Sequence, residues 1–592
     1  MPAGIQDFDK LLAKSGVYVD KTKYFPMLPK KGAVVFCARP RRFGKSLTVS
    51  ALEAFYSGRR ELFKGLAAEK FMNSPEFTPK PVIRLDMNEF NNSKSLEVLE
   101  GKIRKYLTGI AKQYKVALQW DDAASAFSNL LKDVSQAVSQ NIILLIDEYD
   151  SPVLSLIQRS ELTYDERLVD DIREAVRSFY SMIKTNDGIL DFVFITGISK
   201  FSGMGVFSPL NNLVDISTDP EFAAFMGLTQ EELEENFAPH IKATAQKMRM
   251  GEKELLTHIR DYYDGFSFDG ATRVYNPFSA LLFFSKGAFK KYWSWSGSST
   301  FIKKFLRDKK LTVEEFSGLR ISSDFADSPG EIGSTPPAGF LYQAGYLTLR
   351  KDDQGSYSLD YPNFEVRAAL SALFLDNCFA SETQAMEARL NLGDCLAAGD
   401  VLKMVVLFWR MYAGLTYQDH KDAIAVKMSA DVPAGMARAE AEKPPDGTGR
   451  NPNQSYMETM RQQLGESFYR SVLYAFLCGA EAEVSAEKHL SGGRADLEVK
   501  YKGLVYIIEL KTARGSGKAM KAARDGMTQI QTRGYGGAGE NSILISLAVN
   551  LEKSNIEACV FKKNGQTAVL DSQEVFRLTH PGETESDQIQ DS

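Results

Sequence analysis

A short apolar run that ends in a glycine-lysine-serine loop limits the possible folds of this 592-residue chain most strongly. The run, residues 34–37, is apolar on both faces, as are strands of a parallel sheet that helices cover. In the loop that follows, a glycine lets backbone N–H groups approach phosphate oxygens, a lysine reaches the β and γ oxygens, and a serine holds Mg²⁺ at a helix N-terminus. The pattern predicts a phosphate-binding loop whose nucleotide contacts are Arg41, Arg42, Gly44, Lys45, Ser46 and Leu47, with Ser46 on the metal.

Arg39 departs from the usual pattern of such a loop, G-x4-G-K-[ST], because it stands where the first glycine is expected. Taken alone, the loop therefore leaves a basic surface turn open as the alternative.

A second apolar run, residues 142–146, ends in the adjacent carboxylates Asp147 and Glu148. Asp147 is expected to bind Mg²⁺ through water, and Glu148 is expected to polarise the water that attacks a γ-phosphate. By itself the run also fits a strand capped by solvated acids. The loop and the acids together, in this order and about a hundred residues apart, favour nucleotide hydrolysis.

Alternating buried strands and amphipathic helical stretches predict an α/β domain with a parallel sheet. The expected strands are 34–37, 81–85, 142–146 and 192–196. Residues 227–316 have mostly helical periodicity, and residues 339–359 predict a helix end followed by a hairpin, which suits a winged-helix-like module.

Composition and charge narrow the class of protein. With 44% hydrophobic and 25% charged residues, the chain suits a globular protein of about three to four domains. No apolar run approaches the ~18 residues of a membrane helix, and the acidic start does not resemble a signal peptide, so we expect a cytoplasmic protein without a membrane segment. The five cysteines lack metal-ligand spacing and are expected to be reduced core residues.

A net charge of −5 provides no general attraction for nucleic acid, so any such binding depends on local basic clusters. Two clusters stand out, and for each a solvated helix face is the alternative. The first consists of Lys303, Lys304, Arg307, Lys309 and Lys310, and the second of Arg514, Lys518, Lys521 and Arg524.

The second cluster follows another group of chemically suggestive residues. Glu509 and Lys511 lie two apart in an apolar strand run and therefore share a face, and Asp496 begins the preceding strand. Two carboxylates that hold Mg²⁺, beside a lysine that orients or deprotonates water, suit phosphodiester hydrolysis. Glu466, on the helix before, is a candidate third carboxylate.

An ordinary Glu-Lys ion pair at a strand end is the alternative for an isolated E-x-K pattern. The apolar run around it, the glycine turn before Asp496 and the basic helix after it favour a site. Gln529 is expected to contact the nucleic-acid backbone or the nucleophile, and Gln531 competes for that role.

The chain as a whole resembles AAA-ATPase-like proteins whose C-terminal part is a PD-(D/E)XK nuclease-superfamily domain. The strings that carry the resemblance cover nearly the whole chain. They are Tyr18-Val-Asp-Lys-Thr22, Arg39-Pro-Arg-Arg-Phe-Gly-Lys-Ser46, Ile146-Asp-Glu-Tyr-Asp-Ser-Pro152, Thr196-Gly-Ile-Ser199, Phe207-Ser-Pro-Leu-Asn-Asn-Leu213, Tyr263-Asp-Gly-Phe266, Val274-Tyr-Asn-Pro-Phe278 and Tyr361-Pro-Asn-Phe-Glu-Val-Arg367.

This resemblance implies that Arg39 is normal for the group and that Thr196 is the polar sensor near the γ-phosphate. It also implies that Glu466, Asp496, Glu509, Lys511 and Gln529 match the nuclease motif. The implied domains are an AAA-like P-loop ATPase domain (1–225), a helical lid (226–330), a winged-helix-like and helical connector (331–428), a flexible linker (429–455), a restriction-endonuclease-like α/β domain (456–580) and a disordered tail (581–592).

Two functions follow as alternatives. In the first, ATP binding and hydrolysis regulate or drive a Mg²⁺-dependent nuclease that acts on nucleic acid, DNA foremost, in defence against foreign DNA. In the second, the chain is a nucleotide-gated switch or scaffold whose C-terminal domain binds nucleic acid without cutting it. The intact Asp496, Glu509 and Lys511 favour the first. The oligomeric state is left open, with a homo-oligomer as one alternative.

The linker gives a testable prediction. Residues 430–455 are rich in Pro, Gly, Ala and Glu and lack a pattern that buries a core, so limited proteolysis is expected to cut there first. The C-terminal product, followed by mass spectrometry, should have a mass of about 15 kDa. First cuts elsewhere, with this stretch resistant, would contradict the domain boundary.

Overall fold

The structure is a computed structural model that describes residues 4–14, 16–159, 166–198, 210, 212–296, 299–322, 325, 337–378, 391–412, 465–486, 496–515, 517–532, 542–551 and 555–579. The predicted linker and tail lie outside these residues. The chain forms two compact units: unit 1 comprises Met1–Ser298 and Gly318–Val366, and unit 2 comprises Ser299–Ser317 and Arg367–Ser592. Residues 299–317 thus belong to unit 2 although unit 1 continues on both sides of them.

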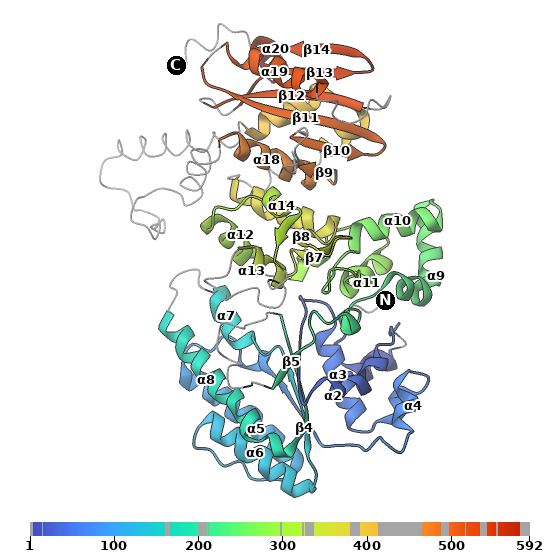
Figure 1. Ribbon diagram of the computed structural model, residues 1–592, viewed down its shortest axis with the longest axis vertical. Coiled ribbons are helices and arrows are strands. Elements are labelled where there is room, and N and C mark those ends of the chain that lie inside the picture. The colour runs from blue at the N-terminus through green and yellow to red at the C-terminus, as the bar shows by residue number, and fades with distance from the viewer. Residues whose placement is uncertain are drawn as a thin grey trace, which may run out of the picture. The chain divides into compact units, whose positions relative to one another are not determined.

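Unit 1 is built on a five-stranded parallel sheet, which confirms the predicted α/β fold (Figure 1). The strands are β1 (Val34–Ala38), β2 (Val82–Asp86), β3 (Ile142–Asp147), β4 (Leu190–Gly197) and β5 (Leu213–Asp215), in the order β2-β3-β4-β1-β5. The four predicted strands are all present, each within two residues of its expected ends. Because the strands are parallel, the chain segments that follow β1, β3 and β4 emerge at one edge of the sheet.

Helices cover both faces of this sheet, which explains its wholly apolar strands. On one face, α5 (Leu96–Tyr114), α6 (Ala123–Val138) and α8 (Glu166–Thr185) pack against Phe36, Leu144 and Ile195 in one core cluster. On the other, α3 (Lys45–Tyr56) packs against β3, and its Tyr56 ring lies 5.7 Å from that of Phe192. The sheet therefore fixes where the loops at its carboxyl edge lie.

Shorter helices complete the first part of unit 1. They are α1 (Phe8–Ala13), α2 (Leu28–Lys31), α4 (Ala68–Met72) and α7 (Ser151–Arg159), with 3₁₀ turns η1 (Thr22–Met27), η2 (Arg60–Phe63), η3 (Met87–Phe90), η4 (Asp187–Ile189) and η5 (Pro220–Phe222).

The middle of the chain is helical, as expected, and contains the predicted hairpin. Helices α9 (Gln230–Met248), α10 (Glu252–Tyr263) and α11 (Pro277–Lys286) enclose a separate core that contains Phe237, Tyr263 and Phe283 among other aromatic residues. After α13 (Pro337–Gln343), strands β7 (Thr348–Lys351) and β8 (Tyr357–Asp360) pair antiparallel, and β6 (Leu319–Ile321) joins β8. The turn η6 (Trp293–Ser296) also belongs to this unit.

Several family strings of the middle region hold unit 1 together. Gly265 has a φ of +112°, and a Cβ there would meet the carbonyl oxygen of Pro362 at 2.1 Å, so only glycine fits. Asn363 Nδ2 donates to the carbonyl of Tyr263 at 3.0 Å. Asn276 caps the N-terminus of α11 and donates through Nδ2 to the carbonyl of Arg41 at 3.3 Å. The last contact ties α11 to the phosphate-binding loop.

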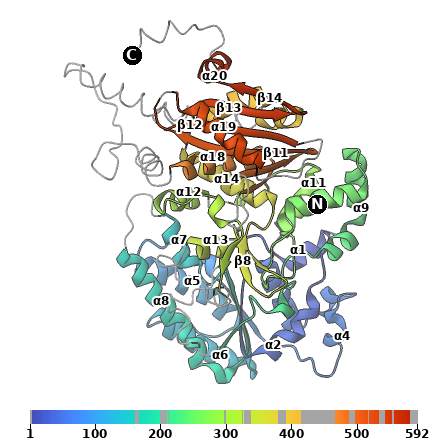
Figure 2. The same cartoon turned by 45° about the horizontal axis from the view of Figure 1, so that its top comes forward.

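Unit 2 contains a six-stranded mixed sheet in the order β14-β13-β12-β11-β10-β9. Its strands are β9 (Glu483–Ala486), β10 (Leu497–Tyr501), β11 (Leu504–Ala513), β12 (Ser542–Asn550), β13 (Asn555–Lys563) and β14 (Gln566–Leu570). β11 and β12 pair parallel, and the other neighbours pair antiparallel. Helix α19 (Ala519–Thr532) lies across β11, β12 and β13 (Figure 2), whereas α18 (Glu466–Gly479) packs against β9 and β11.

The other described helical segments of unit 2 are α12 (Ser299–Asp308), η7 (Glu314–Phe316), α20 (Ser572–Thr579) and residues 391–398 and 401–412, and α14 (Phe364–Cys378) crosses the unit boundary. All five cysteines are buried, as predicted. Among the described residues, no helix is both long enough and apolar enough to cross a membrane.

Candidate functional site

The loop after β1 has a backbone shaped by two residues of positive φ. Arg42 has a φ of 70°, and Gly44, the N-cap of α3, has a φ of 86° with open space where a Cβ would project. Left-handed residues that alternate with residues of negative φ can leave N–H groups facing a concavity, and the helix dipole adds positive potential. The predicted loop thus has the backbone of an anion site.

Lys45 and Glu148 face each other across this concavity. The Lys45 Nζ lies 3.2 Å from Glu148 Oε1 and donates to the carbonyl of Pro40, also at 3.2 Å. Glu148, directly after β3, has a φ of 51°, and this left-handed backbone turns the chain at the strand end. The predicted loop lysine and the predicted acid therefore meet at one edge of the sheet.

Asp147 is buried at the end of β3, and neither of its carboxylate oxygens has a hydrogen-bond partner in the described part of the chain. Arg84 Nη2 lies 3.8 Å from Asp147 Oδ2. Burial, followed by the charge of Glu148, raises the pKa of Asp147 to about 6, although the nearby Ser46 hydroxyl and Lys45 oppose the shift. A buried acid without a donor is a group that a cation would stabilise.

A pocket of about 440 Å³ opens beside Lys45 and Glu148. It is lined by six of the predicted contacts, Arg41, Arg42, Gly44, Lys45, Ser46 and Leu47, and by Glu148. A smaller apolar cavity of about 120 Å³ adjoins it and shares Gly44, Leu47 and Leu281 in its wall. A polar compartment next to an apolar one suits a ligand with a charged end and a flat, weakly polar end.

Asp147, Thr196 and Arg39 lie outside the lining of this pocket. Thr196 is at the end of β4, between β1 and β3, and its Oγ1 donates to the carbonyl of Cys37 at 2.8 Å. Arg39 is buried and turned away from the pocket, with Nη1 donating to the carbonyls of Ala38 and Ser217 and Nη2 to that of Phe222, at 2.8–3.0 Å. Arg39, which stands in place of the first glycine, therefore links the start of the loop to the segment 217–222 through hydrogen bonds.

Sequence reasoning missed Asp150, Asn88 and Ser151, which also line the pocket. Asp150 is buried, and its Oδ2 accepts the N–H of Ile198 at 3.1 Å. Its place two residues after Glu148 was the available indication. Asn88 and Ser151 are joined by a 2.7 Å hydrogen bond, and no pattern in the sequence links them.

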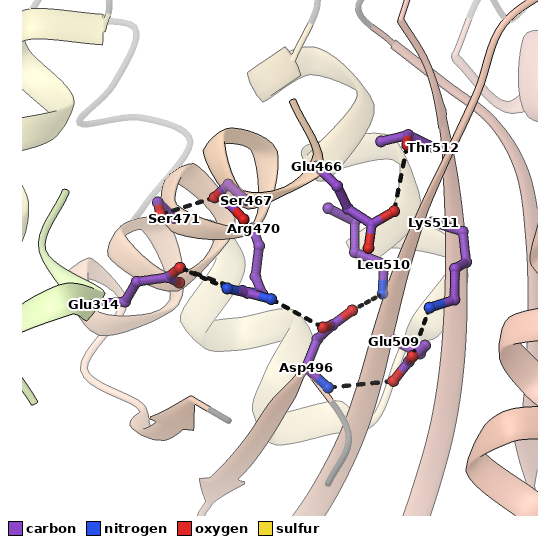
Figure 3. Close-up of polar contacts among 10 residues, drawn as sticks. All are labelled: Glu314, Glu466, Ser467, Arg470, Ser471, Asp496, Glu509, Leu510, Lys511 and Thr512. Carbon is purple, nitrogen blue, oxygen red and sulfur yellow. Dashed lines mark hydrogen bonds and ion pairs between the residues drawn. The ribbon is translucent and has the colours of Figure 1, made fainter. Parts of the chain in front are cut away.

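In unit 2, the register of β10 and β11 brings two predicted carboxylates together. Leu497 pairs with Ile508, so Asp496 stands opposite Glu509, and the Asp496 N–H donates to Glu509 Oε2 at 3.2 Å (Figure 3). Both are buried, although β10 and β11 are near one end of the sheet. Burial, then the charge of Asp496, raises the pKa of Glu509 against the opposing effect of Lys511.

Lys511 lies on the same face as Glu509, as predicted, and its Nζ is 2.9 Å from Glu509 Oε1. Burial acts to lower the pKa of Lys511, but the ion pair with Glu509 outweighs it and the pKa is raised. Gly526 of α19 packs over this pair, because a Cβ there would meet Lys511 Cγ at 3.2 Å and Glu509 Cγ at 3.4 Å. The lysine is thus held as a cation beneath α19.

Glu466, the first residue of α18, accepts a 3.3 Å hydrogen bond from Thr512 Oγ1 and belongs to the same group of side chains (Figure 3). Gln529 follows Gly526 by about one turn of α19, so it lies on the same side of the helix as Gly526, and it is partly buried. Gln531 is exposed. The role of either glutamine at the site stays a prediction.

Arg470 and Glu314 are the members of this group that sequence reasoning missed. Arg470 Nη1 lies 3.2 Å from Asp496 Oδ1, and its Nη2 lies 3.0 Å from Glu314 Oε1. Arg470 follows Glu466 by four residues on α18 and so shares its face, which was a local indication. Nothing local indicated Glu314, which is 156 residues from Arg470 in sequence.

The two basic clusters differ in their surroundings. Lys303 and Arg307 of the first cluster contact acids, Asp376 at 3.9 Å and Asp308 at 3.4 Å. In the second cluster, Lys518 directly before α19 and Lys521 and Arg524 on α19 are exposed, opposite the buried Ala519, Ala523 and Met527. The second cluster is thus the more accessible to an anionic ligand.

Comparisons with known proteins agree with this division of chemistry. Residues 2–207 match the family model described as a predicted AAA-ATPase, and residues 464–558 match the model of the PD-(D/E)XK nuclease superfamily. A protein of Azotobacter chroococcum mcd 1, described as an uncharacterized protein in the vnfD 5' region, is 30% identical over 540 residues, which cover 90% of this chain and 92% of that protein.

A solved structure described as Drosophila ORC bound to AT-rich DNA and Cdc6 was also found, at 11% identity and a TM-score of 0.18, covering 62% of this chain and 93% of that chain. The two family models and the relative that matches over nearly its full length decide the assignment. The chain belongs to the family of AAA-ATPase-like proteins that carry a C-terminal PD-(D/E)XK nuclease-superfamily domain.

Proposed function

We propose that the protein binds and hydrolyses ATP in unit 1 and uses this to regulate or drive Mg²⁺-dependent cleavage of nucleic acid, DNA foremost, in unit 2. One observation carries the proposal. Two buried carboxylates, Asp496 and Glu509, lie side by side, and the ammonium of Lys511 is 2.9 Å from Glu509. The same chain has a glycine-lysine-serine loop whose Lys45 pairs with Glu148.

In the ATP site, each residue has a role that follows from its position. Arg41, Arg42 and Lys45 offset phosphate charge, the N–H groups near Gly44 bind phosphate oxygens, and the apolar cavity beside Leu47 accepts the base. Ser46 and the donorless Asp147 suit a Mg²⁺ ion that accompanies ATP. Glu148, which faces Lys45 in this structure, orients the attacking water, and Thr196 senses the γ-phosphate from β4.

In the nuclease site, the donor set fits Mg²⁺. Four carboxylates (Glu314, Glu466, Asp496 and Glu509) and two cations (Arg470 and Lys511) leave a formal charge of −2 when all are ionised. Among the described residues, no three acids, histidines or cysteines are grouped closely enough to bind a metal by themselves. Mg²⁺ is commonly held by one or two carboxylates together with waters and substrate phosphates, so Asp496 and Glu509 suffice.

The chemistry of the nuclease site follows from these groups. Bound Mg²⁺ would polarise the scissile phosphate and activate water. Asp496 and Glu509 would hold that ion. Lys511, kept charged by its ion pair, orients water and offsets charge on the phosphate. Glu466 adds a third carboxylate beside them, and Gln529 contacts the backbone or the nucleophile.

The exposed Lys518, Lys521 and Arg524 support nucleic acid as the substrate class, since a cationic helix face beside the site attracts a phosphate backbone. The five buried cysteines suit the reducing cytoplasm that we propose as the location. Defence against foreign DNA is the setting that we propose for such cleavage, and assembly into a homo-oligomer stays a proposal.

The proposal is tested by incubating the purified full-length chain with labelled single- and double-stranded DNA and RNA, with Mg²⁺ or Mn²⁺, and with ATP, ADP or no nucleotide. Cleavage of at least one nucleic acid, together with ATP turnover, is expected. Retention of nucleic acid on a gel without cleavage, responsive to ATP, would instead favour the nucleotide-gated switch or scaffold.

The raised pKa of Asp147 predicts a pH dependence of ATP binding. Because this pKa is about 6, the nucleotide-free protein protonates Asp147 as the pH falls from 7 to 5, and the carboxylate that suits Mg²⁺ is lost. Calorimetric titration is expected to show weaker binding of Mg·ATP at pH 5 than at pH 7, with a smaller change in Asp147→Asn. Equal loss in both proteins would assign the effect to other groups. The charged groups near Asp147 are Lys45, Arg84, Asp86 and Glu148.

A further inference from the structure

Asp496 is held from two directions. Its Oδ2 accepts the backbone N–H of Leu510 on β11 at 2.8 Å, and its Oδ1 faces Arg470 Nη1 on α18 at 3.2 Å (Figure 3). Both carboxylate oxygens therefore have a donor, and the donors come from two different elements. Loss of the Arg470 contact would leave one fixed hydrogen bond and a side chain that can turn about it.

Arg470 is in turn held by Glu314. Its Nε and Nη2 donate to Glu314 Oε1 at 3.3 and 3.0 Å, which fixes one edge of the planar guanidinium and aims Nη1 at Asp496. The Glu314 side chain is 9% exposed and that of Arg470 is 23% exposed. Glu314 thus contacts α18 through Arg470, and it also lies beside the Ser471 hydroxyl of the same helix.

Glu314 lies on the turn η7, within residues 299–317. This segment belongs to unit 2, while the residues before and after it belong to unit 1. The acid that pairs with Arg470 therefore comes from a segment that is far from α18 in sequence.

We propose that Arg470 and Glu314 are positioning residues of the nuclease site: Glu314 holds Arg470, and Arg470 holds Asp496 in the orientation that places its carboxylate beside Glu509. This inference rests on the proposed nuclease function. The partners that orient metal-binding side chains commonly contribute about 10- to 100-fold to activity or metal affinity. Neither residue touches the substrate in this account.

Charge-matched variants separate positioning from simple charge balance. Arg470→Met changes the formal charge of the site from −2 to −3, and Glu314→Gln changes it to −1, whereas the double variant keeps −2. If only charge mattered, the double variant would behave like the wild type. If positioning matters, it should be as impaired as Arg470→Met, because Glu314 acts through Arg470.

The experiment measures the cleavage rate against Mg²⁺ concentration and the melting temperature of each full-length protein. In Arg470→Met and in the double variant, we expect a rate lower by about 10-fold or more and a higher Mg²⁺ concentration at half-maximal rate. Arg470→Lys should lie between them and the wild type, because a lysine supplies one point donor but cannot bridge two carboxylates. Should Arg470→Met fail to fold, Arg470→Lys and Glu314→Gln carry the test.

Glu498 and Lys500 provide matched controls, since this ion pair on β10 is exposed (41% and 53%) with a 3.5 Å separation. Lys500→Met and Glu498→Gln should leave both readouts unchanged. A wild-type rate in Arg470→Met, half-maximal cleavage at a lower Mg²⁺ concentration, or recovery in the double variant would overturn the positioning role. An inactive wild type would instead remove the proposed function on which the role depends.

Discussion

Replacement of Asp496, Glu509 or Lys511 by alanine is expected to abolish Mg²⁺-dependent cleavage of nucleic acid while ATP binding in unit 1 is retained. In the proposed mechanism the two carboxylates would hold the cation, and the ammonium of Lys511 would orient water and offset the charge of the phosphate. Gel assays of cleavage and calorimetry of ATP binding provide the two readouts. The Glu498→Ala variant, which alters an exposed acid on the same strand as the site, is the control and should cut normally.

The losses of cleavage rate in the three alanine variants should also be non-additive. Residues that act as one unit fail together, so a double alanine variant should cut no more slowly than either single variant. Activity in any of the three variants close to that of the wild type would mean that this group of residues is not the catalytic centre.

The second large effect concerns the phosphate-binding loop. Lys45→Ala is expected to abolish ATP binding, whereas Glu148→Gln should bind ATP and hydrolyse it roughly 10²-fold or more slowly, as expected for loss of a general base. Removal of Lys45 takes away the cation that meets the phosphates. Replacement of Glu148 by glutamine removes only the group that polarises water. Lys105→Ala, at an exposed position of α5, is the control.

Fluorescent-nucleotide binding and phosphate release measure these two effects separately. Turnover by Glu148→Gln at the wild-type rate would exclude Asp147 and Glu148 as the catalytic acidic pair.

Much of this fold could be predicted because the relevant information is local. The strands of unit 1 are apolar on both faces, and their polar loops follow directly, so the sheet and its functional edge were visible in the order of the residues. Likewise, Glu509 and Lys511 are two residues apart on one strand. Their pairing with Asp496 required only that two neighbouring strands form a hairpin, as β10 and β11 do.

The remainder depends on long-range contacts that no periodicity specifies. Glu314 reaches Arg470 across 156 residues, and Arg39 reaches the carbonyl of Phe222 across 183. Arg39 shows the limit clearly, because the pattern of the loop could report only a missing glycine. In the structure, the guanidinium of Arg39 donates to three backbone carbonyl oxygens and lies 4.0 Å from the centre of the Phe268 ring.

The most direct test of the central claim is a side-by-side cleavage assay of the wild type and Glu509→Gln, purified identically, on end-labelled linear duplex DNA and circular single-stranded DNA with Mg²⁺, with and without ATP. Glu509→Gln keeps the size of the side chain and removes its charge, so folding is preserved while the cation loses a ligand. The account predicts products that are formed only by the wild type and that disappear with EDTA. Equal cleavage by both proteins, or no cleavage by the wild type under any of these conditions, would contradict it.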